Sequence, residues 1–271
     1  MLYKALTIAG SDASGGAGIQ ADLKTFQNYG VYGMSALTVL VAMDYNNNWE
    51  HQIFSIDSTA IDAQITTTLQ GLKPQAIKTG MLPTVEIIGL VSKRIAEECK
   101  NTLVVIDPVM ACKGTAPLFP KNTVAIRQLL LPLADIITPN LFEAAQLADM
   151  QELSTLEEAK NAAIVIHKLG AKIVVIKAVP YDDALICELA FDGEKFACFT
   201  HPKIDTAFNH GAGCTFSASI TAQLAMGKES FAAIADASGY VFAAIKNGER
   251  LNQYTGAIVP ERQIITVDDE V

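Results

Sequence analysis

The chain has 271 residues, of which 50% are hydrophobic and 18% are charged. This hydrophobic content is enough to build a core, which excludes intrinsic disorder, and no unbroken hydrophobic stretch of about 18 residues predicts a membrane-spanning helix. The 29 acidic residues outnumber the 20 basic ones and leave a net charge of −9, which disfavours broad binding of nucleic acids. Local hydrogen-bond donors must therefore hold any anionic substrate.

The cysteines and histidines form neither a disulfide framework nor a zinc motif. The five cysteines are widely spaced, with no Cys-x-x-Cys pair, and the four histidines form no His-Glu-x-x-His motif. Residues 1–9 lead directly into a glycine-rich turn, which predicts a first strand rather than a signal peptide. We therefore expect a cytoplasmic protein with free thiols, in which Cys99, Cys187 and Cys198 pack inside helices or strands.

Strand-like hydrophobic runs alternate with helical patterns along most of the chain. We expect strands over residues 4–9, 36–42, 76–79, 102–107, 135–138 and 171–177. We expect helices near residues 17–29, 58–71, 84–99, 121–132, 141–149 and 155–169. Each strand is hydrophobic on both faces, which is typical of a parallel sheet covered by helices on both sides.

The C-terminal third departs from this alternation. Two short β-like runs within residues 184–200 flank an Asp-Gly turn signal and predict an antiparallel hairpin at the sheet edge. Helices are expected near residues 213–226 and 229–247, and the last twenty residues show no clear pattern. Because no linker and no internal repeat divides the chain, residues 1–271 predict one α/β domain with a mostly parallel sheet.

The first candidate ligand site is the turn GSDASGGAG at residues 10–18. Ligands of open parallel sheets bind beyond the carboxyl ends of the strands, and a glycine-rich turn there lets a ligand approach backbone N–H groups. Residues 16–21 also fit a loose Gly-x-Gly-x-x-Ala dinucleotide pattern, although Asp44 is poorly placed as its acidic partner. A plain connecting turn is the remaining alternative.

The strongest local signal is the segment HGAGC, which directly precedes a helical pattern. The glycines on either side of Ala212 allow a nest of N–H groups at the helix start, where the helix dipole favours a phosphate or a developing negative charge. Cys214 would lie in the first helical turn, a position that lowers a thiol pKa from about 8.5, and could act as a base or nucleophile. The alternative is a flexible hinge with a small buried cysteine.

Other polar residues follow predicted strands. Asp107 could bind magnesium or begin an Asp-Pro turn, and Cys112 follows it on a probable loop. Asn140 and Glu143 could form a helix capping box. Alternatively, Glu143 could point towards a water-ligated magnesium ion. Lys177 could contact a triphosphate or be solvated. The chain contains no Gly-x-x-x-x-Gly-Lys-Ser/Thr motif and no Gly-x-Ser-x-Gly elbow, which excludes P-loop NTPases and the common hydrolase fold.

Taken in order, the segments GSDASGGAGIQADLKTF, KTGML, DPVM, TPN-x-x-E and HGAGC resemble the ribokinase-like kinases of vitamin precursors over nearly the whole chain. These kinases phosphorylate the hydroxymethyl group of pyridoxal-type or hydroxymethylpyrimidine-type rings. The sequence is most similar to bacterial dual-cysteine pyridoxal kinases, because Cys112 and Cys214 occupy both cysteine positions. The pyrimidine kinases usually have alanine in place of Cys112 and glutamine in place of Met43.

The resemblance implies roles for the residues that match these motifs. Gly211, Ala212, Gly213 and Cys214 would form an anion hole, with Cys214 replacing the aspartate base of ordinary ribokinase-like enzymes. Cys112 would attack the pyridoxal aldehyde and form a hemithioacetal that also closes a flap. Six positions match residues around the ring: Gly10, Ala17, Asp22, Met43, Met81 and Cys112.

The resemblance also implies the nucleotide side of the site. Asn140, Lys177, Gly211 and Gly213 would bind ATP, while Glu143 and Asp107 would hold Mg²⁺. A monovalent cation is left open. The implied protein is a homodimer that phosphorylates pyridoxal, pyridoxine and pyridoxamine and binds neither nucleic acid nor membranes.

One segment departs from the family pattern. Two glycines commonly follow the family's lysine, whereas Ala178, Val179 and Pro180 follow Lys177 here. Valine does not readily adopt a positive φ, so this nucleotide loop is expected to take another path. This path either weakens the contacts with ATP or shifts them to Tyr181 and Asp182 through water or metal. Two further hypotheses are therefore kept: a hydroxymethylpyrimidine or hydroxymethylpyrimidine-phosphate kinase of thiamine synthesis, and a binding protein that has lost catalysis.

Overall fold

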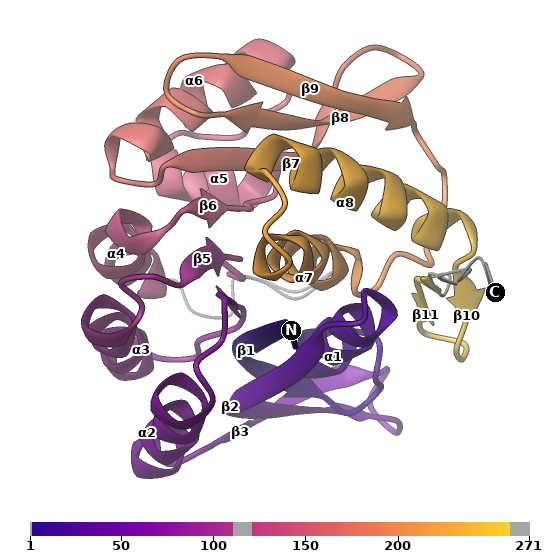
Figure 1. Ribbon diagram of the computed structural model, residues 1–271. Coiled ribbons are helices and arrows are strands. Elements are labelled where there is room, and N and C mark those ends of the chain that lie inside the picture. Colours follow the sequence, from indigo (N-terminus) through magenta and orange to yellow (C-terminus); the bar gives the residue numbers. More distant parts are fainter. Residues whose placement is uncertain (1, 111–120, 261–271) are drawn as a thin grey trace, which may run out of the picture.

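A nine-stranded sheet forms the centre of the protein (Figure 1). The structure is a computed structural model that describes residues 2–110 and 121–260. The strands follow the order β3-β2-β1-β4-β5-β6-β7-β8-β9 across the sheet; β1, β2 and β4 to β7 run parallel, and β3, β8 and β9 run antiparallel to their neighbours. Their bounds are Lys4–Asp12, Tyr32–Asp44, Glu50–Ser55, Ala76–Thr79, Leu103–Ile106, Ile136–Ile137, Ile173–Pro180, Leu185–Phe191 and Phe196–Pro202 for β1 to β9.

Helices cover both faces of this sheet (Figure 1). On one face lie α2 (Ser58–Ile65), α3 (Val85–Glu98), α4 (Asn122–Ala125), α5 (Leu141–Ala148) and α6 (Leu156–Lys168). On the other face lie α1 (Gly18–Asn28), α7 (Ala212–Ala225) and α8 (Ser230–Lys246). A π-helical stretch, Thr66–Leu72, continues α2, and the turns Ile126–Leu130 and Leu131–Leu133 continue α4. None of the helices in the described part of the chain is long and hydrophobic enough to span a membrane.

Successive side chains of the central strands pack alternately against the two helix layers. In β1, Leu6 and Ile8 join the core on one face of the sheet, while Ala5 joins the core on the other. In β5, Ile106 and Val105 separate in the same way. Side chains alternate between the faces of a strand, so a strand buried on both faces is hydrophobic at most positions. The predicted α/β fold with a mostly parallel, doubly covered sheet is confirmed.

The structure also adds elements that the sequence patterns did not predict. β3 is an edge strand with mostly exposed residues, so it has no hydrophobic alternation to reveal it. A small antiparallel pair, β10 (Glu249–Arg250) and β11 (Gly256–Ala257), lies within the C-terminal region where no pattern was found. The predicted hairpin is confirmed as β8 and β9.

The end of β7 differs from the prediction. The strand does not stop at Lys177 but continues to Pro180, with an irregularity in its pairing to β8 after Ile176. Ala178 adopts the positive φ of +55° there, so Val179 can remain extended. The expected change of path is therefore a bulge inside a strand, not a separate nucleotide loop.

Candidate active site

A cavity of about 80 Å³ lies at the carboxyl ends of β1, β2 and β4. Its wall is mostly hydrophobic, and four of the predicted ring residues line it: Gly10, Ala17, Met43 and Met81. Cys214 lies on the same wall. Asp22 does not line this cavity, because it is fully buried behind it. We call this space the first cavity.

The glycine-rich turn after β1 folds around the carboxylate of Asp12. One carboxylate oxygen accepts from the Ser14 N–H at 2.8 Å, and the other accepts from the Ala17 N–H at 3.1 Å. The oxygen that accepts from Ala17, Oδ2, also lies 2.6 Å from Nε2 of His210, which precedes α7. Burial disfavours the charged Asp12, but the hydrogen bonds from His210 and Ser14 outweigh it and lower the pKa of the carboxyl group. This contact ties the first turn to the segment before α7.

The segment before α7 requires glycine at one position. Gly211 has a φ of +88°, and a Cβ there would lie 1.9 Å from the carbonyl oxygen of Gly16. A Cβ on Gly213 would lie 3.3 Å from Nζ of Lys177, so the lysine head lies against the start of α7. The first N–H groups of a helix have no partner within it, and here they lie next to this cation. The arrangement suits an anion, as the sequence predicted.

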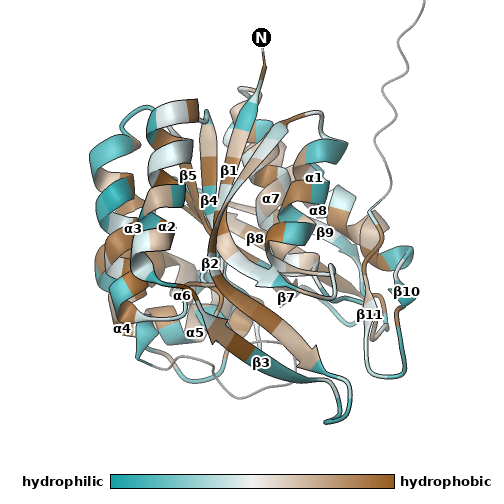
Figure 2. Cartoon of the chain, turned by 90° about the horizontal axis from the view of Figure 1, so that it is seen from below, coloured by the Kyte–Doolittle hydropathy of each residue, from teal (hydrophilic) through white to brown (hydrophobic). Residues whose placement is uncertain are grey.

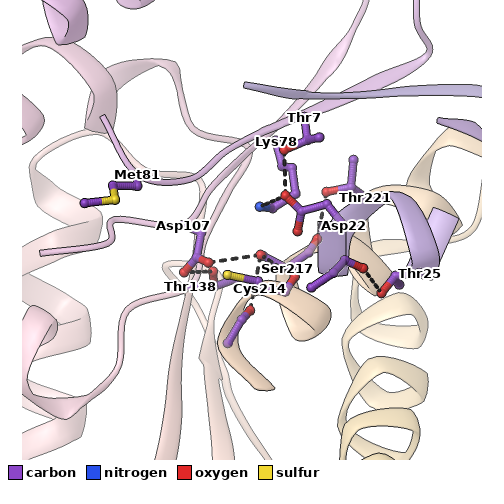
Figure 3. Close-up of polar contacts among 12 residues, drawn as sticks. Thr7, Asp22, Thr25, Lys78, Met81, Asp107, Thr138, Cys214, Ser217 and Thr221 are labelled. Atoms are coloured by element: carbon purple, nitrogen blue, oxygen red, sulfur yellow. Dashed lines mark hydrogen bonds and ion pairs between the residues drawn. The ribbon is translucent and has the colours of Figure 1, made fainter. Parts of the chain in front are cut away.

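The Cys214 side chain is half-buried, and its thiol lies beside three charged groups. Figure 3 shows its side chain near Asp107 and Ser217. The ion pair of Asp22 and Lys78 lies in the same close-up, and both of its charges act on the thiol. Burial is the main cause that raises the pKa of this thiol to about 12, and the negative charge of Asp22 adds to it, while Lys78 opposes both. The prediction that the helix start lowers this pKa is therefore wrong, because burial dominates.

Lys78 and Asp22 form an ion pair with no exposed side-chain surface. Lys78 Nζ lies 2.8 Å from Asp22 Oδ2, which also accepts a hydrogen bond from the Thr7 hydroxyl at 2.6 Å (Figure 3). Burial disfavours the Lys78 cation, yet the combined effect of Asp22, Cys214 and Asp107 outweighs it and raises the pKa of the lysine. Burial raises the pKa of Asp22, which Lys78 opposes. Lys78 was not predicted as a site residue. The sequence feature that could have indicated it is a lysine inside the short strand β4, where the KTGML motif begins.

A second ion pair joins Lys177 to Asp107. Lys177 Nζ lies 2.9 Å from Asp107 Oδ1, and the Lys177 side chain is only 13% exposed, which excludes the solvated lysine considered from the sequence. Asp107 also accepts hydrogen bonds from the hydroxyl groups of Thr138 at 3.3 Å and Ser217 at 3.1 Å. The strand-end carboxylate is therefore held firmly in place.

Asn140 and Glu143 form the capping box at the start of α5. The Asn140 side chain accepts from the Glu143 N–H at 2.8 Å, and the Glu143 carboxylate accepts from the Asn140 N–H at 2.9 Å. Burial raises the pKa of Glu143 to about 7; Lys177 opposes this shift and the charge of Asp107 adds to it. The capping alternative is confirmed, and the residue is also a buried carboxyl group next to a second one.

These two carboxylates fit a magnesium ion that is held largely by phosphates and water. Within residues 2–110 and 121–260, no three histidine, cysteine or acidic side chains form a metal cluster. Mg²⁺ commonly uses one or two carboxylates and keeps several waters beside substrate phosphates. A cation would also relieve the repulsion between Asp107 and Glu143 that raises the pKa of Glu143.

A second cavity of about 220 Å³ lies on the other side of the start of α7. Its lining combines polar groups with hydrophobic side chains of α7 and α8; the polar residues are Asn140, Lys177, Glu188 and His201. Tyr181 and Asp182 do not contribute to it; Asp182 instead accepts from the Ala184 and Leu185 N–H groups in the turn between β7 and β8. Cys112 lies outside the described residues.

The family model for phosphomethylpyrimidine kinase matches residues 12–259. The chain belongs to this family. It is 54% identical over 260 residues to pyridoxine kinase of Bacillus subtilis strain 168, covering 94% of each chain. It is also 44% identical to the hydroxymethylpyrimidine/phosphomethylpyrimidine kinase of the same strain, covering 91% of this chain and 90% of the relative.

Solved structures agree with the sequence matches. The ADP complex of Bacillus subtilis pyridoxal kinase superposes with a TM-score of 0.91 at 53% identity, covering 97% of this chain and 98% of that one. Staphylococcus aureus pyridoxal kinase with AMP-PCP and pyridoxal gives a TM-score of 0.88 at 43% identity, covering 95% and 93%. The predicted membership of the ribokinase-like vitamin kinases is confirmed.

Proposed function

We propose that this chain is an ATP-dependent kinase that phosphorylates the 5′-hydroxymethyl group of pyridoxal to give pyridoxal 5′-phosphate. Pyridoxine and pyridoxamine are expected as further substrates. One observation supports this most strongly: Cys214, in the first turn of α7, lines the hydrophobic first cavity, and Lys177 lies against the same turn. A ring bound in the first cavity would place its hydroxymethyl group between the thiol and the incoming phosphate.

The reaction needs positioning and charge stabilisation more than covalent chemistry from the protein. The 5′-hydroxyl oxygen attacks the γ-phosphorus, its proton passes to Cys214, and the bond to the β,γ-bridging oxygen of ATP breaks. N–H groups of residues 211–214 and the Lys177 ammonium stabilise charge on the transferred phosphoryl group. Burial raises the pKa of this thiol to about 12, so Cys214 must lose its own proton to solvent before it can act as the base, and the Lys78 cation favours the resulting thiolate.

Mg²⁺ would be held by Asp107 and Glu143 and would supply charge neutralisation for the phosphates of ATP. The carboxylate of Asp107 already accepts from Lys177, Thr138 and Ser217, so its position is fixed by the protein. Asn140 lies on the wall of the second cavity and is placed to contact the nucleotide. A requirement for a monovalent cation stays a prediction.

Side-by-side kinetics distinguish the candidate substrates. We expect the purified protein, with ATP, Mg²⁺ and a reductant, to turn over pyridoxal faster than hydroxymethylpyrimidine. Turnover of the pyrimidine alone would instead indicate a kinase of thiamine synthesis, an alternative that the 44% identical relative supports. Vitamin binding without ATP consumption would indicate a binding protein that has lost catalysis.

Cys112 is proposed to form a hemithioacetal with the pyridoxal aldehyde. A thiol adds to an aldehyde, whereas pyridoxine has no aldehyde to trap. Cys112→Ala should therefore reduce kcat/KM for pyridoxal more than for pyridoxine. Equal losses on both substrates would refute this role.

The proposed assembly is a cytoplasmic homodimer. The cross-strand pair Leu40 and Phe54 is exposed on the outer face of β2 and β3, where hydrophobic residues are prominent (Figure 2). A second copy of the chain would cover this face. Light scattering should give about twice the 29.0 kDa chain mass, and Phe54→Glu should shift it towards the monomer mass; a wild-type protein with the monomer mass would contradict the proposal.

A further inference from the structure

The strands that carry Lys177 do not pair residue for residue beside the second cavity. Two residues of β7, Lys177 and Ala178, lie opposite the single residue Glu188 of β8. This bulge forces Ala178 to a φ of +55°, a backbone region that glycine adopts freely and that strains alanine. Something must therefore hold Ala178 in this conformation.

The side chain of Glu188 holds it. Glu188 Oε2 accepts a hydrogen bond from the Ala178 N–H at 3.0 Å, and the residue is only 7% exposed. The other oxygen, Oε1, lies 3.6 Å from Nε2 of His201 on β9. The His201 ring in turn packs against Phe242 of α8, with ring centroids 5.0 Å apart. The carboxylate is thus oriented from one side by the bulge and from the other by the histidine.

The conformation of the bulge determines where the Lys177 side chain lies. The Lys177 N–H donates to the carbonyl oxygen of Pro139 at 2.9 Å, so the residue joins β7 to the segment before α5. Its ammonium group lies between Asp107 and the start of α7, close to Gly213. Without the bulge, the regular alternation of side chains along β7 would be restored, and the direction of the Lys177 side chain would change.

We propose that Glu188, oriented by His201, is a positioning residue that keeps Lys177 aimed at the anion hole. Its hydrogen bond to the Ala178 N–H replaces the freedom that a glycine would have at that position. The inference rests on the proposed contact between Lys177 and the phosphates of ATP. Glu188 itself transfers no proton and touches no reacting atom.

A double substitution tests this role. Glu188→Leu keeps a similar size but cannot accept the Ala178 N–H, and we expect it to raise KM for ATP about tenfold, the effect of losing one charged hydrogen bond. KM for pyridoxal should change less than about twofold, because the first cavity does not include Glu188. In an Ala178→Gly background the same substitution should raise KM for ATP less than about threefold, since glycine holds the conformation alone.

Two control variants test whether the effect depends on the hydrogen-bond acceptor at position 188. Glu188→Gln retains an oxygen that can accept the N–H and should stay within about threefold of the wild type for ATP. Glu194→Ala removes an exposed carboxylate from the turn between β8 and β9 and should change neither KM. If Glu188→Leu alone does not fold, the double variant with Ala178→Gly carries the test, because a tenfold rise in its KM for ATP contradicts the proposal.

Calorimetric titration with ADP separates this proposal from the proposed function, since it needs no turnover. We expect Lys177→Met and Glu188→Leu both to weaken ADP binding. If Lys177→Met binds ADP normally, the phosphate contact is wrong and the role of Glu188 is wrong with it. If Lys177→Met weakens ADP binding and Glu188→Leu does not, or if Ala178→Gly gives no rescue, only the role of Glu188 is overturned.

Discussion

Two lysine–aspartate pairs lie at the carboxyl end of the sheet, one beside each cavity. Lys78 and Asp22 are completely buried, and both side chains lack exposed surface. Lys177 and Asp107 are almost as close, at 2.9 Å, but the Lys177 side chain keeps 13% of its surface exposed and lies against the start of α7. The first pair is therefore closed to any ligand, whereas the second keeps a partly exposed cation, which we propose contacts a phosphate of ATP.

The comparison predicts that loss of Lys78 mainly lowers the stability of the fold, whereas loss of Lys177 mainly lowers catalytic activity. Lys78→Met should destabilise the fold by about 3–5 kcal/mol, because it leaves the Asp22 charge buried without a partner. Urea denaturation measures this loss. The double variant Asp22→Asn and Lys78→Met removes both charges and should recover part of it; a single variant as stable as the wild type would contradict the account of the buried pair.

The segment between the two pairs depends on Gly211. Gly211→Ala should cost about 3 kcal/mol of stability, from the strain of a positive φ together with the contact to the Gly16 carbonyl. Gly227→Ala is a matched control, since its φ of +85° is nearly the same and no atom lies within 4 Å of its added Cβ. Equal losses in thermal or urea unfolding would show that the contact to Gly16 contributes nothing.

Loss of the second lysine should affect catalysis more than stability. Lys177→Met should lower kcat/KM for ATP about 10- to 100-fold, the range for losing one or two hydrogen bonds from a charged donor. Asp107 keeps its bonds from Thr138 and Ser217, so the fold should persist. Steady-state kinetics measure the loss of activity, and circular dichroism checks that the fold is retained. If Lys177→Met unfolds the protein, the two ion pairs do not differ in the way proposed.

The second pair also predicts a pH dependence through Glu143. Its pKa is raised from 4.5 to about 7, so the folded state binds a proton that the unfolded state releases between these values. Its contribution to stability is therefore full below about pH 4.5 and falls as the pH rises to about 7, by about 3 kcal/mol. Unfolding of the wild type and of Glu143→Gln at several pH values isolates this contribution; a difference between them that does not vary with pH would refute the shift.

Local patterns were enough to predict the central strands and the order of the chemical motifs. A strand such as β5 is hydrophobic at every position because both faces of the sheet are covered, while the exposed β3 gave no such signal. The motif before α7 located Cys214 correctly, but the pKa of its thiol depends on burial and on Asp22, which no local pattern contains. Contacts between distant parts of the chain were also missed, as with Asp12 and His210, which are 198 residues apart.

The same limit applies to the segment after Lys177. The sequence correctly indicated that Val179 would not adopt a positive φ, but it could not show that Ala178 would do so. The reason is a partner on another strand, Glu188, whose hydrogen bond stabilises the strained residue. Strain of this kind is compensated by tertiary contacts, which a single sequence does not display.

The most direct test of the central claim is ATP-dependent turnover of pyridoxal by the wild type and by Cys214→Ala. We expect pyridoxal 5′-phosphate from the wild type and no measurable turnover from Cys214→Ala, with circular dichroism and ADP binding unchanged. Those two controls keep loss of the base distinct from loss of the fold or of the nucleotide site. Full turnover by Cys214→Ala would contradict the account of Cys214 as the group that accepts the hydroxyl proton.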